Sequence, residues 1–172
     1  MEYWDLFDEQ ERPLGKTHLR GTPLPEGAYH RVVCVWLMDR DGRFLMSRRS
    51  ENKAGAHLWE RSGGSVLAGE SPEEGARREV KEELGIDLSD KKLHFLRTRL
   101  REQYSCFCYD YLCIIDKNVK ITLQKEEVED SRFMTLAEIE EIASRRELLA
   151  NAYNFRSALD FFEAIKDAPD GT

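Results

Sequence analysis

Hydrophobic residues fall into short runs and alternating patterns along this chain, and most of these patterns predict strands. Residues 28–39 are nearly all apolar from Val32 to Met38, which indicates a central strand that is buried on both faces. A turn signal at 40–43 leads into a second, paired strand at 44–47. The chain is therefore expected to contain a sheet that is organised around the first of these strands.

The same criteria predict further extended segments, at 2–7, 57–61, 92–103, 104–115, 119–123 and 132–134. Residues 10–27 are rich in glycine and proline and are interpreted as an irregular loop or ribbon. The glycine-bearing segment 62–64 is expected to be a loop. Residues 126–130 are expected to form an acidic loop, and their simplest interpretation is a solvated turn.

One amphipathic helix carries the strongest start and stop signals in the chain. Ser71 is suited to the N-cap, Pro72 to the first helical position, and Glu74 completes a capping box. Gly85 directly follows Leu84 and is typical of a helix C-terminus. These signals predict a helix that begins after Ser71 and ends at about Leu84.

The last part of the chain predicts two more helices. One follows Thr135, which forms a capping box with Glu138. The other spans residues 151–166, where aromatic and aliphatic residues recur at helical spacing. The tail from Asp167 is expected to be frayed.

Three glutamates on the central helix are the first sign of chemistry. Glu79, Glu82 and Glu83 have the spacing i, i+3 and i+4, so they lie within about 100° of arc on an ideal helix. Like charges at this spacing destabilise a helix, and a divalent cation would offset that repulsion. Oxygen ligands favour magnesium or manganese over zinc. The alternative is an ordinary solvated helix face.

Composition excludes several other classes of protein. The chain has 172 residues, of which 41% are hydrophobic and 34% charged, and the formal net charge is -7. A chain of this length fits one domain with a substantial core. The negative net charge disfavours a nucleic-acid polymer as partner. We find no apolar stretch long enough for a membrane span and no secretory signal at the N-terminus. The four cysteines form no CxxC pair, which favours buried thiols in a reducing, cytoplasmic compartment.

The residues around the three glutamates resemble a complete Nudix box. The matching positions are Gly64, Glu70, Arg78, Glu79, Val80, Glu82, Glu83, Gly85 and Ile86. The resemblance implies a single α/β domain over 1–172, with 1–27 as an N-terminal extension. The implied fold is an α/β/α sandwich with a mixed, curved β-sheet. The implied activity is hydrolysis of a diphosphate linkage in a small nucleoside-diphosphate-X type substrate, with Mg²⁺ or Mn²⁺ as cofactor.

The resemblance also implies roles for particular residues. Metal ligands would be Glu79, Glu82, Glu83 and the backbone carbonyl of Gly64, with Glu70 and Arg78 as supporting residues. The first choice of general base is Glu79. Some family members use a glutamate from a later loop, which here could be Glu126, Glu127 or Glu129. The basic cluster of Arg48, Arg49 and Lys53 is either a solvated loop or a set of phosphate contacts.

Residues 4–8, the turn through Gly15 and residues 29–31 resemble the flanking sequence of Nudix proteins related to isopentenyl diphosphate isomerase. That enzyme would be expected to carry a catalytic cysteine just after the tryptophan of the short strand. Here Trp59 is followed by Glu60, Arg61 and Ser62, so hydrolysis is favoured over isomerisation. A non-catalytic binding module of the same fold is a second alternative. A homodimer is compatible with the sequence but is not indicated by any residue pattern.

Overall fold

The computed structural model of this protein describes residues 1–167, and its sheet is organised around strand β3, His30–Met38. On one side β3 pairs in parallel with β8, Cys106–Ile114. On the other side β3 is shared by two antiparallel partners. Its first half pairs with β6, Ser62–Ser65, and its last two residues pair with β4, Phe44–Arg49. The sheet is thus mixed, and it divides at the point where β3 changes partner.

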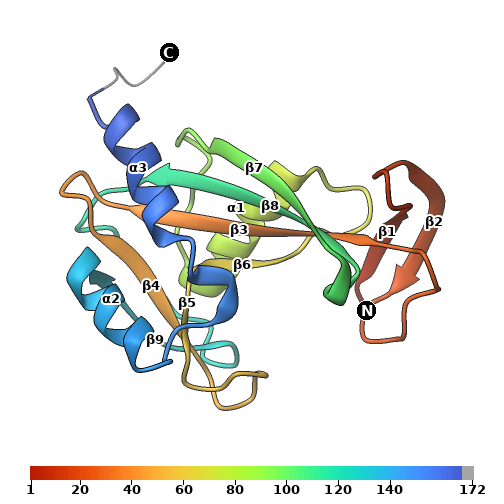
Figure 1. Ribbon diagram of the computed structural model, residues 1–172, viewed down its shortest axis with the longest axis horizontal. Helices are drawn as coiled ribbons and strands as arrows, with labels where there is room; N and C mark the ends of the chain where they lie inside the picture. Colours follow the sequence, from red (N-terminus) through yellow and green to blue (C-terminus); the bar gives the residue numbers. More distant parts are fainter. Residues whose placement is uncertain (168–172) are drawn as a thin grey trace.

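The remaining strands extend this sheet on both sides. They are β5 Trp59–Glu60 beside β4, β9 Val128–Met134 on the other side of β4, and β7 His94–Arg101 beside β8. A separate two-stranded ribbon is formed by β1, Tyr3–Phe7, and β2, Pro13–Leu19. This ribbon projects from one end of the molecule (Figure 1) and meets the main sheet through a bridge between Phe7 and Tyr29.

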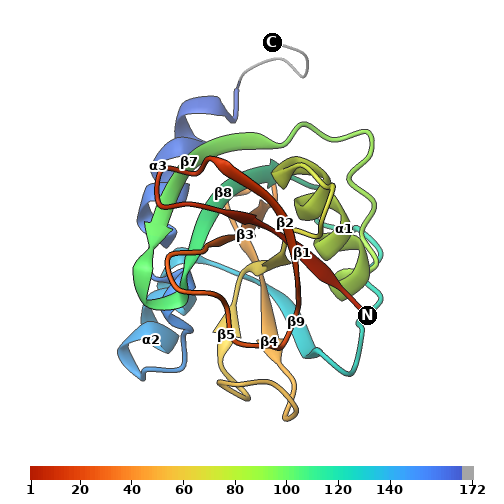
Figure 2. The same ribbon diagram turned by 90° about the vertical axis from the view of Figure 1, so that its right-hand side faces the viewer.

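Helices cover both faces of the main sheet. Helix α1, Pro72–Leu84, lies on one face, and helices α2, Leu136–Ser144, and α3, Phe155–Ile165, lie on the other (Figure 2). Two 3-10 turns, Glu102–Tyr104 and Ala150–Ala152, complete the described elements. The arrangement confirms the predicted α/β/α sandwich with a mixed sheet.

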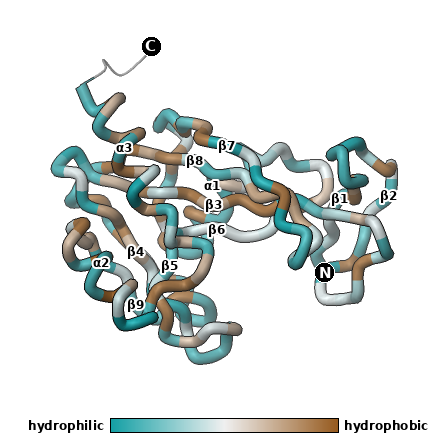
Figure 3. Tube along the Cα trace, viewed as in Figure 1, coloured by the Kyte–Doolittle hydropathy of each residue, from teal (hydrophilic) through white to brown (hydrophobic). Residues whose placement is uncertain are grey.

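Two hydrophobic clusters follow from the alternation of side chains along β3. Val33, Val35 and Leu37 face α1, together with buried residues of that helix. Trp36 and Met38 belong to the second cluster, which lies against α2 and α3. Figure 3 shows hydrophobic residues along much of β3 and hydrophilic residues in the surface turns. The prediction that this central strand is buried on both faces is therefore confirmed.

Several sequence-based boundaries are wrong. Residues 62–64 belong to strand β6, where Gly63 approaches β3 so closely that a Cβ atom would lie 2.2 Å from the carbonyl oxygen of Val33. Residues 119–123 form no strand. The acidic segment is a turn only up to Glu127, and β9 begins at Val128. The last helix begins at Phe155, after a 3-10 turn.

The expected fraying of the tail concerns mainly residues 168–172, which lie outside the described residues. Within residues 1–167, none of the helices combines the length and apolar content that crossing a membrane requires.

Candidate active site

Helix α1 is fixed at both ends by the contacts that its sequence predicts. The Ser71 side chain accepts a hydrogen bond from the backbone N–H of Glu74, and the Glu74 carboxylate accepts one from the backbone N–H of Ser71. At the other end Gly85 adopts a left-handed conformation with φ of 68°. A helix held in this way presents its glutamates in a defined direction.

The segment 119–123 forms no strand and instead caps the C-terminal end of helix α1 through backbone hydrogen bonds. The backbone N–H of Thr122 donates to the carbonyl of Leu84 at 2.8 Å, and that of Gln124 donates to the carbonyl of Glu83 at 3.0 Å. These donors satisfy carbonyl groups that have no partner inside the helix. The polar backbone of this segment is therefore used at the helix terminus.

The three glutamates of α1 lie in different environments. Glu79 and Glu83 are buried, with 7% and 2% of their surface exposed, whereas the side chain of Glu82 is 51% exposed. Burial raises the pKa of Glu79 above its ordinary value. Two of the three carboxylates are thus held out of water at the edge of the hydrophobic cluster.

Glu83 is oriented by strand β6 and by one lysine. Its Oε2 atom accepts hydrogen bonds from the Ser62 hydroxyl at 2.5 Å and from the backbone N–H of Gly63 at 3.3 Å. The Nζ atom of Lys53 lies 3.7 Å from Oε1. Burial raises the pKa of Glu83 to about 8, despite the Ser62 hydrogen bond and the nearby Lys53.

Glu79 lies directly against the backbone of β6 at Gly64. A Cβ atom added to Gly64 would be 2.4 Å from Oε1 and from Cδ of Glu79, a distance that no side chain tolerates. Gly64 is paired with Val33 of the central strand, so the backbone cannot move away without breaking the sheet. The glycine therefore lets a carboxylate and a strand backbone lie side by side.

Arg78 connects the glutamates to one another. It donates to both oxygens of Glu70 at 2.7 and 3.1 Å, and to the carbonyl of Ser65 at 2.8 Å. It also donates to Glu79 at 2.9 Å and to Glu82 at 3.0 Å. Burial opposes its charge, but the bonds to Glu70 and Glu79 raise its pKa above the ordinary value. Arg78 thus fixes the positions of three carboxylates.

This arrangement fits a hard divalent cation. Its potential ligand atoms are all oxygens, from Glu79, Glu82, Glu83 and the backbone at Gly64. Two of the carboxylates are buried on the same helix face, where Glu79 contacts Arg78 and Glu83 contacts Lys53. A cation between them would stabilise their ionised forms, which burial disfavours.

The structure separates the three basic residues that were predicted together. Lys53 is beside the glutamates, where it contacts Glu83. Arg49 donates to Glu60 at 2.6 Å and to the carbonyl of Ala54 at 2.8 Å. Arg48 donates to the carbonyl of His57 at 3.0 Å and is 42% exposed. Of this cluster, Lys53 is the residue that contacts a carboxylate of α1, that of Glu83.

The three glutamates proposed as alternative bases also differ in position. Glu127 accepts a hydrogen bond from Lys53 at 2.8 Å, and this bond lowers its pKa although burial opposes the shift. Glu129 is bonded to Nδ1 of His57 at 2.9 Å and lies 3.1 Å from Arg48. Glu126 is exposed, and its backbone carbonyl accepts from Ser50. Glu127 is therefore connected to the helix glutamates through Lys53.

Two residues of this site were not predicted from the sequence. The Ser62 hydroxyl holds Glu83, and the Ser65 carbonyl holds Arg78. A strand at 62–65 places the Ser62 side chain toward α1, whereas the Ser65 contact is made by a backbone carbonyl and has no signal in the sequence. Interpreting residues 62–64 as a loop concealed the direction of the Ser62 side chain.

The sequence and the fold of this chain are similar to those of known proteins. The sequence profile of the NUDIX domain matches residues 28–153. An uncharacterized Nudix hydrolase of Listeria monocytogenes is 39% identical over 156 residues, which cover 87% of this chain and 89% of that protein. An isopentenyl-diphosphate Delta-isomerase of Salmonella heidelberg is 35% identical over 96 residues, which cover 52% of this chain and 50% of the isomerase.

Similarity of structure extends over more of the chain. A crystal structure of a Deinococcus radiodurans protein matches with a TM-score of 0.73 and 23% identity. The match covers 93% of this chain and 98% of the other. At this level of identity the match establishes a shared fold.

Proposed function

This chain belongs to the Nudix family and is a Nudix-type hydrolase, and from that premise we propose that it cleaves the diphosphate linkage of a small nucleoside-diphosphate-X type compound with Mg²⁺ or Mn²⁺. Nudix hydrolases act on derivatives of nucleoside diphosphates. The observation that carries the proposal is the contact between Glu79 and the backbone at Gly64, with buried Glu83 beside it.

Each residue of the site has a proposed role. The carboxylates of Glu79, Glu82 and Glu83 and the carbonyl of Gly64 would hold the cation. A bound divalent cation neutralises diphosphate charge and lowers the pKa of a coordinated water. Arg78 keeps the carboxylates in position through its hydrogen bonds.

Three residues are proposed to act on substrate or water. Glu79 is the first choice to accept the proton of the attacking water, because burial raises its pKa toward the working range of a general base. Glu127 is the alternative base, since its bond to Lys53 places it next to Glu83. Lys53 is proposed to contact a phosphate oxygen of the substrate.

The proposal is tested by incubating the protein with a panel of nucleoside-diphosphate compounds and either Mg²⁺ or Mn²⁺. We expect metal-dependent release of phosphate-containing products from at least one compound, and no release when EDTA is present. Tight binding of a compound with no turnover under either metal would instead support a binding module.

Isomerase activity is the second candidate, because part of this chain is 35% identical to an isopentenyl-diphosphate isomerase. Glu60 and Arg61 follow Trp59 where a catalytic cysteine would be expected, and all four cysteines of the chain are buried. We therefore expect no dimethylallyl isomer when the protein is incubated with isopentenyl diphosphate and metal. Formation of that isomer at an enzymatic rate would replace hydrolysis as the conclusion.

Two further expectations accompany this proposal. The four free thiols are compatible with a reducing cytoplasmic compartment. A homodimer and the exclusion of nucleic-acid polymers as partners stay predictions of the sequence.

A further inference from the structure

A buried ion pair lies on the face of the sheet that is turned away from α1. Arg61 and Asp110 are both 0% exposed, and Nη2 of Arg61 donates to Oδ1 of Asp110 at 2.6 Å. Arg61 lies between β5 and β6, and Asp110 belongs to β8. A fully buried arginine is rare in proteins and requires an explanation.

Two more arginines surround the same carboxylate. Nε of Arg97 lies 3.1 Å from Oδ2 of Asp110, and Nη2 of Arg99 lies 3.0 Å from the same atom. Both come from β7 and are partly exposed, at 41% and 33%. Burial alone would raise the pKa of Asp110, but Arg61 and Arg99 hold it below its ordinary value. Three guanidinium groups therefore share one carboxylate.

Some of the guanidinium donors at this cluster have no acceptor. Among residues 1–167, Nε and Nη1 of Arg61 and Nε of Arg99 are buried without a hydrogen-bond partner. The guanidinium carbon of Arg61 lies 5.1 Å from the centre of the Trp36 ring, which attracts the charge but accepts no conventional hydrogen bond. Buried donors of a charged group without an acceptor are costly, and an added anion would satisfy them.

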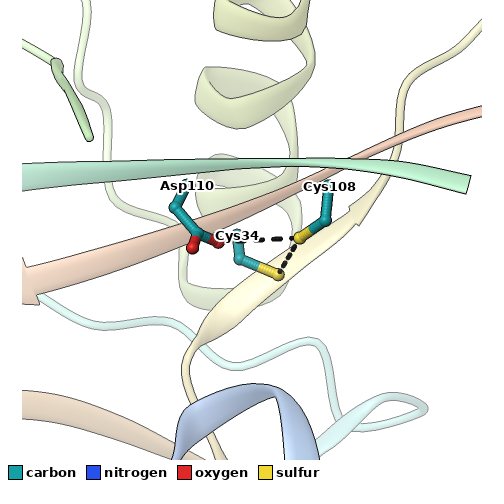
Figure 4. A group of neighbouring side chains, drawn as sticks. All are labelled: Cys34, Cys108 and Asp110. Atoms are coloured by element: carbon teal, nitrogen blue, oxygen red, sulfur yellow. Dashed lines mark hydrogen bonds between the residues drawn. The ribbon is translucent and has the colours of Figure 1, made fainter. Parts of the chain in front are cut away.

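The neighbouring thiols do not turn this cluster into a cation site. The sulfur atoms of Cys34 and Cys108 and a carboxylate oxygen of Asp110 all lie within 4.8 Å of one another. Figure 4 shows these three side chains pointing toward each other from β3 and β8. However, the Asp110 oxygens are already bonded to Arg61, Arg97 and Arg99. Three positive charges at this place repel a cation and attract an anion.

The arginine cluster is connected to the glutamates of α1 through β6. Arg61 and Ser62 are consecutive, so their side chains point to opposite faces of the sheet, and Ser62 holds Glu83. The sheet divides here, because β3 changes its partner from β6 to β4.

Polar side chains follow the same division. Glu60 is hydrogen-bonded to Arg49 and Asn151. The positive charge of Lys53 favours the ionised forms of both Glu60 and Glu83. In the amide orientation that pairs both of its polar groups, Asn154 accepts from Nη2 of Arg97 at 2.8 Å and donates to the carbonyl of Asn151 at 3.0 Å. Polar contacts thus run from the metal side to the arginine side.

We propose that Arg61, Arg97 and Arg99 bind an anionic group, a phosphate or a carboxylate, that the substrate carries in addition to its scissile diphosphate. That the anion belongs to a substrate rests on the proposed hydrolase function. That an anion binds here rests on the buried guanidinium N–H groups without an acceptor. Arg61 and Arg99 supply the free N–H groups, and Arg97 adds charge at the exposed side. Asp110 keeps the three guanidinium groups close together, because each of them contacts its carboxylate.

Binding of an anion is tested without metal and without turnover. Inorganic phosphate and acetate are titrated separately into isotopically labelled protein in EDTA, and the arginine Nε–Hε resonances are followed by NMR. We expect a saturable shift of the Arg61 and Arg99 signals with one of the two anions, which identifies phosphate or carboxylate as the ligand. If neither anion gives a saturable shift of these signals, the proposal is wrong.

Variants separate this site from the metal site. The double variant Arg97→Gln with Arg99→Gln should lower the affinity for the anion about tenfold or more. Arg145→Gln, at the end of α2, should leave this affinity unchanged. Glu79→Gln should also leave anion binding unchanged. An equal loss in Arg145→Gln would show that general surface charge, and not this cluster, binds the anion.

The link to substrate is tested by kinetics on the best compound from the diphosphate panel. The double variant should raise KM about tenfold with little change in kcat, because the interaction exists before and during the reaction. An unchanged KM would overturn the substrate role even if the free anion binds. If no compound is hydrolysed, the proposed function fails, while the NMR titration still decides whether the anion site exists.

Discussion

The backbone of Gly64 passes so close to the Glu79 carboxylate that a Cβ atom at this position would lie 2.4 Å from it. This contact joins a central part of the sheet to the helix that carries the glutamates, because Gly64 is paired with Val33. The carboxylate can occupy its place only if residue 64 has no side chain.

Gly64→Ala should displace Glu79 and lower both Mn²⁺ affinity and kcat by about tenfold or more. The physical reason is steric, since the methyl group and the carboxylate cannot share the same space. Mn²⁺ binding is measured by electron paramagnetic resonance, and folding by circular dichroism. Ser65→Ala, the next residue of β6, is the matched control and should behave as wild type. A folded Gly64→Ala protein with unchanged Mn²⁺ affinity would contradict the assignment.

Lys53→Met should lower kcat/KM by about tenfold, since the Lys53 ammonium is the cation nearest to Glu83 and Glu127. Arg48→Met should have a much smaller effect, because Arg48 is engaged with His57 and Glu129 and is partly exposed. Steady-state kinetics on one diphosphate substrate compares the two variants. Equal losses in both would mean that the whole basic cluster acts through its general charge.

Glu83 should make the metal-free protein less stable as the pH rises from about 4.5 to about 8. In this range the folded protein keeps the Glu83 proton, because burial raises its pKa to about 8, whereas the unfolded chain has lost it. The folded state therefore binds more protons, and the free energy of unfolding falls with pH.

Urea unfolding in EDTA at several pH values measures this effect. Glu83→Gln should remove the Glu83 contribution to the fall in the free energy of unfolding with pH. In the wild type, saturating Mn²⁺ should reverse this contribution. The same slope in wild type and Glu83→Gln would show that the carboxyl group is not protonated in the folded, metal-free protein.

Asp110→Asn should destabilise the fold by about 3–5 kcal/mol, because it leaves buried Arg61 without a counter-charge. Replacing both partners, Arg61→Met with Asp110→Leu, should recover most of that loss. Urea denaturation gives both values. A double variant that is no more stable than Asp110→Asn would show that the pair is required for packing rather than for charge balance.

Local signals were sufficient to predict helix α1 and its glutamates. The capping box of Ser71 with Glu74 and the left-handed Gly85 act within a few residues, so the sequence contains them completely. The apolar run in β3 likewise predicted a central strand that is buried on both faces. The proposed metal ligands Glu79, Glu82 and Glu83 were found for the same reason.

Contacts between distant segments could not be predicted in this way. Residues 119–123 have strand-like composition, but the backbone of Thr122 is bonded to Leu84 at the end of α1. The Arg61 and Asp110 pair joins residues 49 positions apart, and neither residue is unusual by itself. The one available signal was an aspartate inside the apolar strand β8, which indicates a buried partner without identifying it.

The most direct test of the central claim is Mn²⁺ binding and Mn²⁺-dependent hydrolysis in Glu79→Gln and Glu83→Gln. Glu73→Gln is the control, because Glu73 lies on the same helix, is half-exposed and pairs with Arg77. We predict that both test variants fold, bind Mn²⁺ at least about tenfold more weakly and lose at least about 100-fold in kcat, while Glu73→Gln keeps wild-type values. Hydrolysis at the wild-type rate in Glu79→Gln and Glu83→Gln would contradict the account.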